Sequence, residues 1–400
     1  MHRFAAILII LCAMLPAGDA KPFVHPGLVT NAADIAMIRA MVAAKTAPWS
    51  AGWDHLQQRA AFYLGRVAKP TDTYTDSPHW YFPGTAQDFL LDGEAAYGNT
   101  LLWLFAPDQR AAEPHLRKAI EILDAWGAVL RRNTAGNNDR MLFTSYSFPA
   151  FLYAAELIRT QSTQWPAARQ ADFATMVRTV LVPHLEAREI GNNHRSWAVN
   201  AHIAAGVYLD DRAIYNRGLE RLRGHMTSYI EASGYNTEFR RDPDHASMGL
   251  GPIAVACEIA WKQGDDLWMH GDGRLVRAFE DYALVYLGDL DAMPNINKRK
   301  PWETGARANA FRPREFPAFN GTTWQIFEVP HNHYVNRMGM TLPKLQGAVA
   351  KMRPEFFWRM GWGTLLHAGD SAAWAKGQPA GAGRPAAPSP AATRAATPRR

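Results

Sequence analysis

Cysteine is scarce in this 400-residue sequence, which contains only two. Cys12 lies in an apolar run near the N-terminus, so Cys257 is left alone in the body of the chain and cannot form an internal disulfide. No apolar stretch after the first twenty residues is long enough to cross a bilayer. The body must therefore rest on the large hydrophobic core that a chain of about 355 residues can bury.

Strand signals are also scarce, since no run of β-branched residues shows clean alternation. Helical periodicity of apolar residues dominates instead, interrupted by short segments rich in Gly, Asn, Asp and Pro. It predicts helices over residues 31–44, 53–68, 113–130, 148–159, 168–186, 197–208, 213–232 and 252–262. This pattern predicts an all-α fold of antiparallel helical hairpins, arranged as an α/α toroid (an incomplete barrel) or as an open α-solenoid. The lack of a fixed repeat period favours the toroid.

The first twenty residues are predicted to be a secretory signal peptide. A short basic start precedes an apolar run from Phe4 to Leu15, and Gly18 and Ala20 offer small side chains at a cleavage site. Leu11, which precedes the cysteine of this run, is too bulky for the usual lipoprotein signal, so no lipid anchor is expected. We therefore expect a periplasmic or secreted protein with no membrane attachment after cleavage.

Residues 376–400 are rich in Ala and Pro, carry five basic and no acidic side chains, and show no apolar periodicity. Such a segment cannot bury enough surface to order itself, so we predict a disordered tail and one toroid domain over residues 21–375. The tail supplies most of the net charge of +6 and leaves the body near +1. The high pI therefore does not indicate a nucleic-acid partner.

Two long segments between predicted helices, residues 71–84 and 291–329, are rich in proline, polar and aromatic residues. Loops of this length inside a compact domain are usually lids or binding loops. The fourteen tryptophans of the chain fit stacking platforms for sugar rings, although several are expected to belong to the core.

The first of three polar clusters runs from Gly191 to Trp197 and contains Asn192, Asn193 and His194. It lies between two predicted helices, where polar side chains can project into a cleft. An asparagine offers two donors and an acceptor, and a neutral histidine offers a base. The residue types alone fit an Asn-rich helix cap with an incidental histidine equally well.

The second cluster runs from Glu238 to His245 and crowds Arg240 and Arg241 with three carboxylates and a histidine. Arginine is suited to a bidentate grip on a carboxylate, so this segment could hold an acidic substrate. The alternative is an internal salt-bridge cluster.

The third cluster, His331 to Tyr334, follows the second long segment. A tyrosine can transfer a proton once its pKa is lowered. The alternative is a surface segment or a core tyrosine.

The order of these clusters resembles that of the α/α-barrel alginate lyase family and of the related glucuronan lyases. The most specific element is Asn192-Asn193-His194 ahead of Trp197, and the similarity runs from about residue 25 to residue 370. Weaker matches in the same order are segments 25–28, 147–159, 241–251 and 332–334. The resemblance implies a lyase that cleaves an acidic, uronate-containing polysaccharide by β-elimination, without a metal or another cofactor.

The resemblance also implies roles for individual residues. Asn193 neutralises the C6 carboxylate, Arg241 clamps it, and His194 is the base, or the partner of the base, that removes the C5 proton. His245 completes the expected catalytic set. Residues expected to bind the substrate are Asn192, Trp197, Arg240, Tyr146, His333 and Tyr334. The chemistry agrees, because C5–H is acidic enough to react only when the adjacent carboxylate is neutralised, and preorganised donors commonly supply the largest catalytic contribution.

The sequence departs from the family at the general acid. The family carries a tyrosine several residues after the clamp arginine, whereas this chain has only the stretch from His245 to Met248 there. Either His245 transfers the proton to the leaving oxygen, or a tyrosine from elsewhere does so. The tyrosines considered are Tyr146, Tyr235 and Tyr334.

Three rival functions remain open at this stage. A glycoside hydrolase on the same fold would need two carboxylates. The available ones are Asp88, Glu238, Asp242 and Asp244. A metallohydrolase would use histidines, although no H-E-x-x-H spacing is present. The histidines considered are His194, His245, His331 and His333. A non-catalytic, periplasmic polysaccharide-binding protein could share the fold, because a fold alone does not guarantee activity. The oligomeric state is left open.

Overall fold

The computed structural model describes residues 21–75, 85–134, 138–185, 191–240, 243–289, 322–323, 326–357 and 361–377. These residues are mainly helical, and none of the helices in this part of the chain is long and apolar enough to span a membrane. The predicted signal peptide, nearly all of the predicted tail and most of both predicted long loops lie outside the described residues, as does Arg241. The expectations for them stay predictions.

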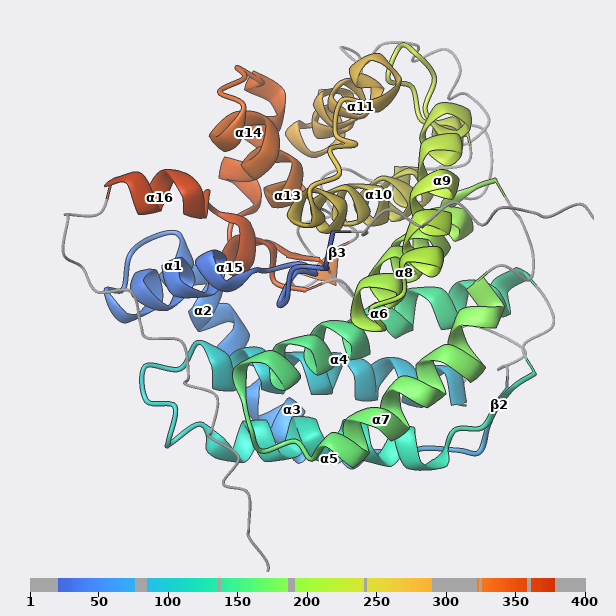
Figure 1. Cartoon of the computed structure of the whole chain (residues 1–400). Helices are drawn as coiled ribbons and strands as arrows, with labels where there is room; N and C mark the ends of the chain where they lie inside the picture. The colour runs from blue at the N-terminus through green and yellow to red at the C-terminus, as the bar shows by residue number, and fades with distance from the viewer. Residues whose placement is uncertain are drawn as a thin grey trace, which may run out of the picture.

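Four long helices form an inner row in which each packs against the next (Figure 1). They are α4 (Thr85–Leu104), α6 (Asn138–Gln161), α8 (Asn193–Tyr208) and α10 (Pro243–Gln263). Neighbours cover these helices on all sides, and every residue of α8 except Arg195 is buried. A helix buried all round needs small or apolar residues on every face, which explains the runs of alanine in α8 and in α10.

Each inner helix is followed along the chain by a helix of an outer row, and α4, α8 and α10 pack against the helix that follows them. The outer helices are α5 (Glu113–Val129), α7 (Ala167–Met176), α9 (Arg212–Tyr229) and α11 (His270–Leu287). In α9 the buried residues Tyr215, Leu219, Leu222, Met226 and Tyr229 recur at helical spacing and face α8, while the other face is charged. The arrangement is the all-α toroid that the periodicity predicts.

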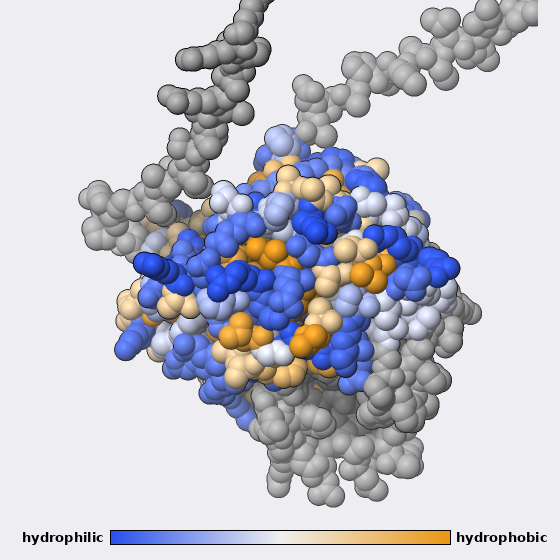
Figure 2. Space-filling model, turned by 90° about the horizontal axis from the view of Figure 1, so that it is seen from below, coloured by the Kyte–Doolittle hydropathy of each residue, from blue (hydrophilic) through white to orange (hydrophobic). Residues whose placement is uncertain are grey.

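The face seen from below is largely hydrophilic where it is coloured, and it carries only small, separate hydrophobic clusters (Figure 2). Clusters of this size are ordinary on a folded protein and need no partner to explain them.

Helices from the two ends of the chain pack against one another beside the inner row. The N-terminal set is α1 (Ala32–Ala43), α2 (Trp49–Gln57) and α3 (Ala60–Gly65). The C-terminal set is α13 (Glu328–His331), the π-helix η6 (Asn332–Arg337), α14 (Pro343–Met352), α15 (Gly363–His367) and α16 (Ser371–Gly377). α1 contacts α16 and α2 contacts α15, while α2 and α3 contact α4 and α13 contacts α10 (Figure 1).

A buried network of charges joins these terminal helices to α10. Lys262 of α10 pairs with Asp34 of α1 at 2.6 Å and with Glu258 at 2.9 Å. Arg337 of η6 grips the same Glu258 through both carboxylate oxygens, at 2.6 and 2.8 Å, and pairs with Asp370 at 3.0 Å. Because every charge has an opposite partner, mutual attraction offsets the cost of removing these groups from water.

The strands are minimal. β1 (Thr73–Tyr74) pairs in parallel with β2 (Arg132–Asn133), and β3 (Thr322–Thr323) pairs in parallel with β4 (Phe356–Phe357). Two-residue pairs of this kind tie loops together and build no sheet, as the scarcity of strand signals predicts.

Two helices differ from the prediction because they contain proline. α10 begins at Pro243 and runs through Pro252, where the prediction starts it, and α6 likewise runs through Pro149. An interior proline removes a hydrogen bond and costs about 3 kcal/mol in an exposed helix. Here the flanking residues are buried on both sides, so packing in the inner row overrides the local preference.

Candidate functional site

The first polar cluster forms the N-terminus of α8. Asn192 is the N-cap residue, with extended backbone, and its Oδ1 accepts a hydrogen bond from the backbone N–H of His194 at 3.1 Å. Asn193 is the first helical residue and is fully buried, while His194 is 7% exposed. The cap interpretation is therefore correct for Asn192, and the cap places the next two side chains at the end of a central helix.

Asn193 is held by Glu238, which stands at the start of the second cluster. The backbone N–H of Asn193 donates to Glu238 Oε2 at 3.0 Å, and its side-chain Nδ2 donates to Glu238 Oε1 at 3.0 Å. Glu238 lies in the 3₁₀ helix η3 (Thr237–Arg240) and is only 8% exposed. The structure thus joins the first cluster to the second through this carboxylate.

Glu238 is itself fixed by further hydrogen bonds. The Tyr229 hydroxyl donates to its Oε2 at 2.9 Å, and its backbone N–H donates to Asn236 Oδ1 at 2.8 Å. Burial raises the pKa of the Glu238 carboxyl, although the donors from Asn193 and Tyr229 oppose this effect. Burial and the nearby Glu238 charge hold the pKa of Tyr229 well above its usual range, so Tyr229 keeps its proton.

The Asn193 amide retains hydrogen-bonding capacity. Its Oδ1 is buried and has no hydrogen-bond partner among the residues that the structure describes. Since Nδ2 carries two hydrogens and gives one to Glu238, a second N–H and the whole carbonyl oxygen are left for a ligand. Buried polar atoms are rarely left without a partner, and those that are often mark a functional site.

Aromatic side chains pack around this helix end. The rings of Tyr146 on α6 and Trp197 on α8 meet edge to face with centroids 5.7 Å apart, and both residues are buried. Two residues along α8 from His194, Ser196 Oγ contacts His225 Nε2 of α9 at 2.8 Å. Burial lowers the pKa of His225 to about 3, so this histidine is neutral and structural. Tyr146 and Trp197 therefore lie near the candidate site but pack as core residues in this conformation.

His245 lies at the start of α10 and is half-buried. Its charge acts on the Glu238 carboxyl, and its backbone carbonyl accepts a hydrogen bond from the Tyr229 hydroxyl at 3.4 Å. His245, Glu238 and Asn193 are therefore brought together. Arg241 lies outside the described residues and the side chain of Arg240 is not described, so their expected contacts with a carboxylate stay predictions.

The third cluster is embedded in the packing between α10, η6 and the residues before α11. Tyr334 is fully buried and its hydroxyl donates to the backbone carbonyl of Trp268 at 2.8 Å. The His333 ring stacks on the Trp268 ring with centroids 4.5 Å apart, and burial lowers the pKa of His333 to about 4. Neither side chain reaches the surface in this conformation, so their expected contact with substrate stays a prediction.

Sequence reasoning overlooked the role of Glu238, which it counted only as a spare carboxylate for hydrolysis. It also gave no role to Tyr229 or Asn236. No local signal pairs Glu238 with an asparagine 45 positions earlier. Among the described residues, no group of three or more His, Cys, Asp or Glu side chains could hold a metal ion.

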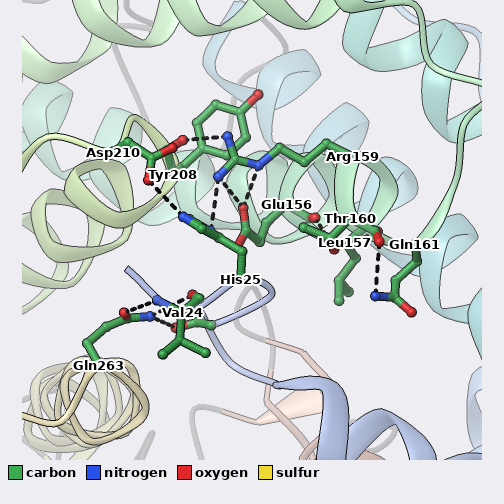
Figure 3. Close-up of polar contacts among 11 residues, drawn as sticks. Val24, His25, Glu156, Leu157, Arg159, Thr160, Gln161, Tyr208, Asp210 and Gln263 are labelled. Atoms are coloured by element: carbon green, nitrogen blue, oxygen red, sulfur yellow. Dashed lines mark hydrogen bonds and ion pairs between the residues drawn. The ribbon is translucent and has the colours of Figure 1, made fainter. Parts of the chain in front are cut away.

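A second polar region lies at the far end of α6 (Figure 3). His25 contacts Glu156 at 2.6 Å and Asp210 at 2.9 Å, while Arg159 donates to Glu156 at 2.8 Å and to the Tyr208 carbonyl at 2.8 Å. Burial lowers the pKa of His25, but the two carboxylates outweigh this effect and raise it.

A hollow of about 500 Å³ opens beside this region. Its lining is Trp103, Gln109, Arg110, Glu113 and residues 159–164. Arg159 lies 13 residues beyond Tyr146 on α6, or about 20 Å along the helix, so this hollow is remote from Asn193 and His194. The polar contacts of Arg159 with its own chain point to a clasp between segments.

Comparison with known proteins identifies relatives. Residues 46–291 match the protein family described as alginate lyase. No curated protein matches the chain by sequence. An alginate lyase from Bacteroides ovatus has a similar structure, with 14% identity, a TM-score of 0.53 and coverage of 74% of this chain and 94% of that one.

Structures of alginate lyase A1-III are also similar. The enzyme from Sphingomonas species A1 shows 16% identity and a TM-score of 0.53 over 80% of this chain and 94% of that one. A variant of alginate lyase A1-III complexed with a tetrasaccharide shows 16% identity and a TM-score of 0.58 over 86% of this chain and 97% of that one. At these identities the similarity shows a shared toroid fold.

Proposed function

Since the chain belongs to the alginate lyase family and is a polysaccharide lyase, we propose that it cleaves an acidic, uronate-containing polymer, alginate or a close relative, by β-elimination. We also propose that it is exported to the periplasm or the medium, as its N-terminal twenty residues predict. The observation that carries the proposed reaction is the buried N-terminus of α8, where Asn193 presents an unpaired carbonyl oxygen and an N–H beside His194.

The proposed reaction breaks the C5–H and C4–O4 bonds, and it forms a bond from the base to hydrogen, the π bond of C4=C5 and an O4–H bond. A base takes the C5 proton, the C5–H electron pair forms the C4=C5 double bond, and the C4–O4 bond breaks. A proton is then delivered to O4, so that one product ends in an unsaturated uronate. Asn193 serves by donating a hydrogen bond from Nδ2 to the C6 carboxylate, which stabilises the negative charge that develops there.

Proton transfer is assigned to histidine. His194 follows Asn193 directly and carries an imidazole, the side chain that most often serves as a general base, so it is the proposed acceptor of the C5 proton. His245 lies in the same cluster and is the proposed donor to O4, in place of the tyrosine of the family. Arg241 is proposed to clamp the carboxylate, as the resemblance implies.

Two of the four carboxylates considered for hydrolysis, Glu238 and Asp88, are already engaged, which favours elimination over the hydrolase alternative. Glu238 accepts hydrogen bonds from Asn193 and Tyr229, and Asp88 pairs with Arg66 at 2.9 Å. A hydrolase needs one carboxylic acid and one carboxylate facing the glycosidic bond. Neither group is placed to serve in that way while these contacts last.

The test is an ultraviolet assay on purified protein with polymannuronate, polyguluronate, glucuronan and hyaluronan. The proposal expects a rise in the absorbance of the C4=C5 unsaturated uronate on one of these polymers, unaffected by EDTA. New reducing ends without that absorbance would replace the proposal with hydrolysis. Binding of a polymer without any chain shortening would replace it with a non-catalytic binding protein.

A further inference from the structure

Glu238 has no part in the proton transfers, yet both of its carboxylate oxygens accept hydrogen bonds from Asn193. We propose that Glu238 is a positioning residue, which fixes the Asn193 amide so that its second Nδ2 hydrogen faces the carboxylate of the substrate. This inference rests on the proposed function, because it specifies how the carboxylate neutraliser is held.

The two hydrogen bonds to Asn193 fix its backbone and its side chain together. Oε2 of Glu238 accepts from the backbone N–H and Oε1 accepts from Nδ2, each at 3.0 Å. An ionised carboxylate can only accept, so the amide atom that faces it must be the nitrogen. Turning the amide by half a turn would set Oδ1 against Oε1, and two acceptors repel each other. Glu238 thereby selects one of the two amide orientations.

Glu238 can impose this orientation because α9, Asn236 and, through Asn236, α10 fix its own position. Tyr229 at the end of α9 donates to Oε2 at 2.9 Å, and Asn236 accepts from the Glu238 backbone N–H at 2.8 Å. Asn236 is fully buried and donates to the Ala246 carbonyl of α10 at 3.0 Å. A group held by several bonds on rigid elements loses little freedom when the substrate binds.

The charge of Glu238 is also favourably placed. It lies at the N-terminus of α8, where the first backbone N–H groups have no partner within the helix. A negative group there is stabilised by the helix dipole, and charge-assisted bonds are stronger than neutral ones. The result is an asparagine whose Oδ1 stays unpaired although the residue is fully buried, which is the state expected of an amide reserved for a ligand.

The experiment is a double-mutant cycle on the full chain, with the polymer that wild type cleaves. Glu238→Gln keeps the shape but adds a donor, so the Asn193 amide can turn over. We expect kcat to fall about 10- to 100-fold and KM to change less than about threefold, because a misplaced group costs rate more than binding. In the Asn193→Ala background, adding Glu238→Gln should change kcat by less than about twofold, because the residue acts through Asn193.

Two other variants distinguish a loss of the Asn193 amide orientation from a general effect of substitution on the protein. Tyr229→Phe removes one bond to Glu238 and leaves both bonds to Asn193, so it should reduce kcat less than Glu238→Gln does. Glu220→Gln alters an exposed Arg217 pair and serves as the control for the substitution itself. Near wild-type kcat in Glu238→Gln, or a loss that multiplies with that of Asn193→Ala, would overturn the inference.

A readout without catalysis keeps this test distinct from that of the proposed function. In ¹⁵N-labelled protein, the Asn193 side-chain amide pair should shift in Glu238→Gln and stay in place in Glu220→Gln. If wild type cleaves no polymer, the proposed function fails, and the amide signals still decide whether Glu238 orients Asn193. If the signals do not respond to Glu238→Gln, the positioning role is wrong whatever the activity.

Discussion

Asn193 and His194 share the first turn of α8. In the proposed mechanism, the group that binds the C6 carboxylate and the base that accepts the C5 proton are therefore adjacent. The helix cap at Asn192 fixes the direction of this turn, and Glu238 fixes the amide. His194 is 7% exposed, so it is buried but still touches the surface. Each of these side chains depends on its neighbour for orientation, and none is placed by its own rotamer preference alone.

Removing the base should therefore abolish most activity and leave the fold intact. For His194→Ala we expect kcat to fall about 10²- to 10⁴-fold, the usual contribution of a positioned general base. The ultraviolet assay measures the loss, and circular dichroism with thermal unfolding checks the fold. His270→Ala, at the start of α11, is the matched control. Turnover by His194→Ala close to that of wild type would remove His194 from the proposed mechanism.

The N-terminal segment, residues 21–31, acts at the scale of elements by clasping helices that are distant in sequence. Gln263 at the end of α10 accepts from the Val24 N–H at 2.9 Å and donates to the Gly27 carbonyl at 2.7 Å. His25 binds Glu156 of α6 and Asp210, which lies between α8 and α9 (Figure 3). The segment thereby joins α6, α10 and the turn between α8 and α9.

The clasp should weaken as the pH rises. The pKa of His25 is raised in the folded protein, so its stabilising contribution is complete below the pKa of an unfolded histidine and is lost as the pH passes the folded pKa. His25→Ala should therefore lower the free energy of unfolding by about 1–3 kcal/mol at pH 6, and by less at pH 9. Urea unfolding at both pH values measures this difference, with His270→Ala as control. An equal loss at both pH values would show that His25 contributes packing only.

At the scale of the whole molecule, the toroid depends on the charge network between its terminal helices and α10. Lys262 is the shared cation of Asp34 and Glu258, and it is 2% exposed. Removing it leaves two carboxylates buried with too few partners, although Arg337 still neutralises part of the charge on Glu258.

Lys262→Met should consequently destabilise the protein by about 3–5 kcal/mol, the usual effect of breaking a buried pair. Lys118→Met is the matched control, because Lys118 pairs with the exposed Glu121 on α5 and should cost less than about 1 kcal/mol. Urea unfolding compares the two variants. Similar losses in both would mean that the buried network is no more important than a surface pair.

The sequence predicted the bounds of the outer helices α5 and α9 more accurately than those of the inner helices. α5 and α9 have one buried face, which periodicity detects, whereas α4 has no such face because even Asp92 and Asn99 are buried. The outer helix α11 was missed although it has one buried face. Of the inner helices, α4 was missed and α6, α8 and α10 were predicted too short. Burial on all sides removes the contrast between faces on which such a prediction depends.

The candidate site was predictable to the extent that its parts are local. The asparagine pair and His194 form a motif within three positions, and the motif led to the family. The contact of Glu238 with Asn193 arises from the packing of η3 against α8, so no spacing in the sequence encodes it. The burial of His333 and Tyr334 likewise follows from their contacts with Trp268, which a local pattern cannot reveal.

The contacts of Asp34 also bear on the order in which the chain can fold. Asp34 accepts a hydrogen bond from Ser371, 337 positions later, and from Lys262, 228 positions later. Closing loops of this length costs more entropy than closing a hairpin, so such contacts form late. During synthesis the hairpins α4/α5 and α8/α9 can assemble as they emerge, but α1 must wait for nearly the whole chain. The helix that is made first is thus among the last to reach its final place.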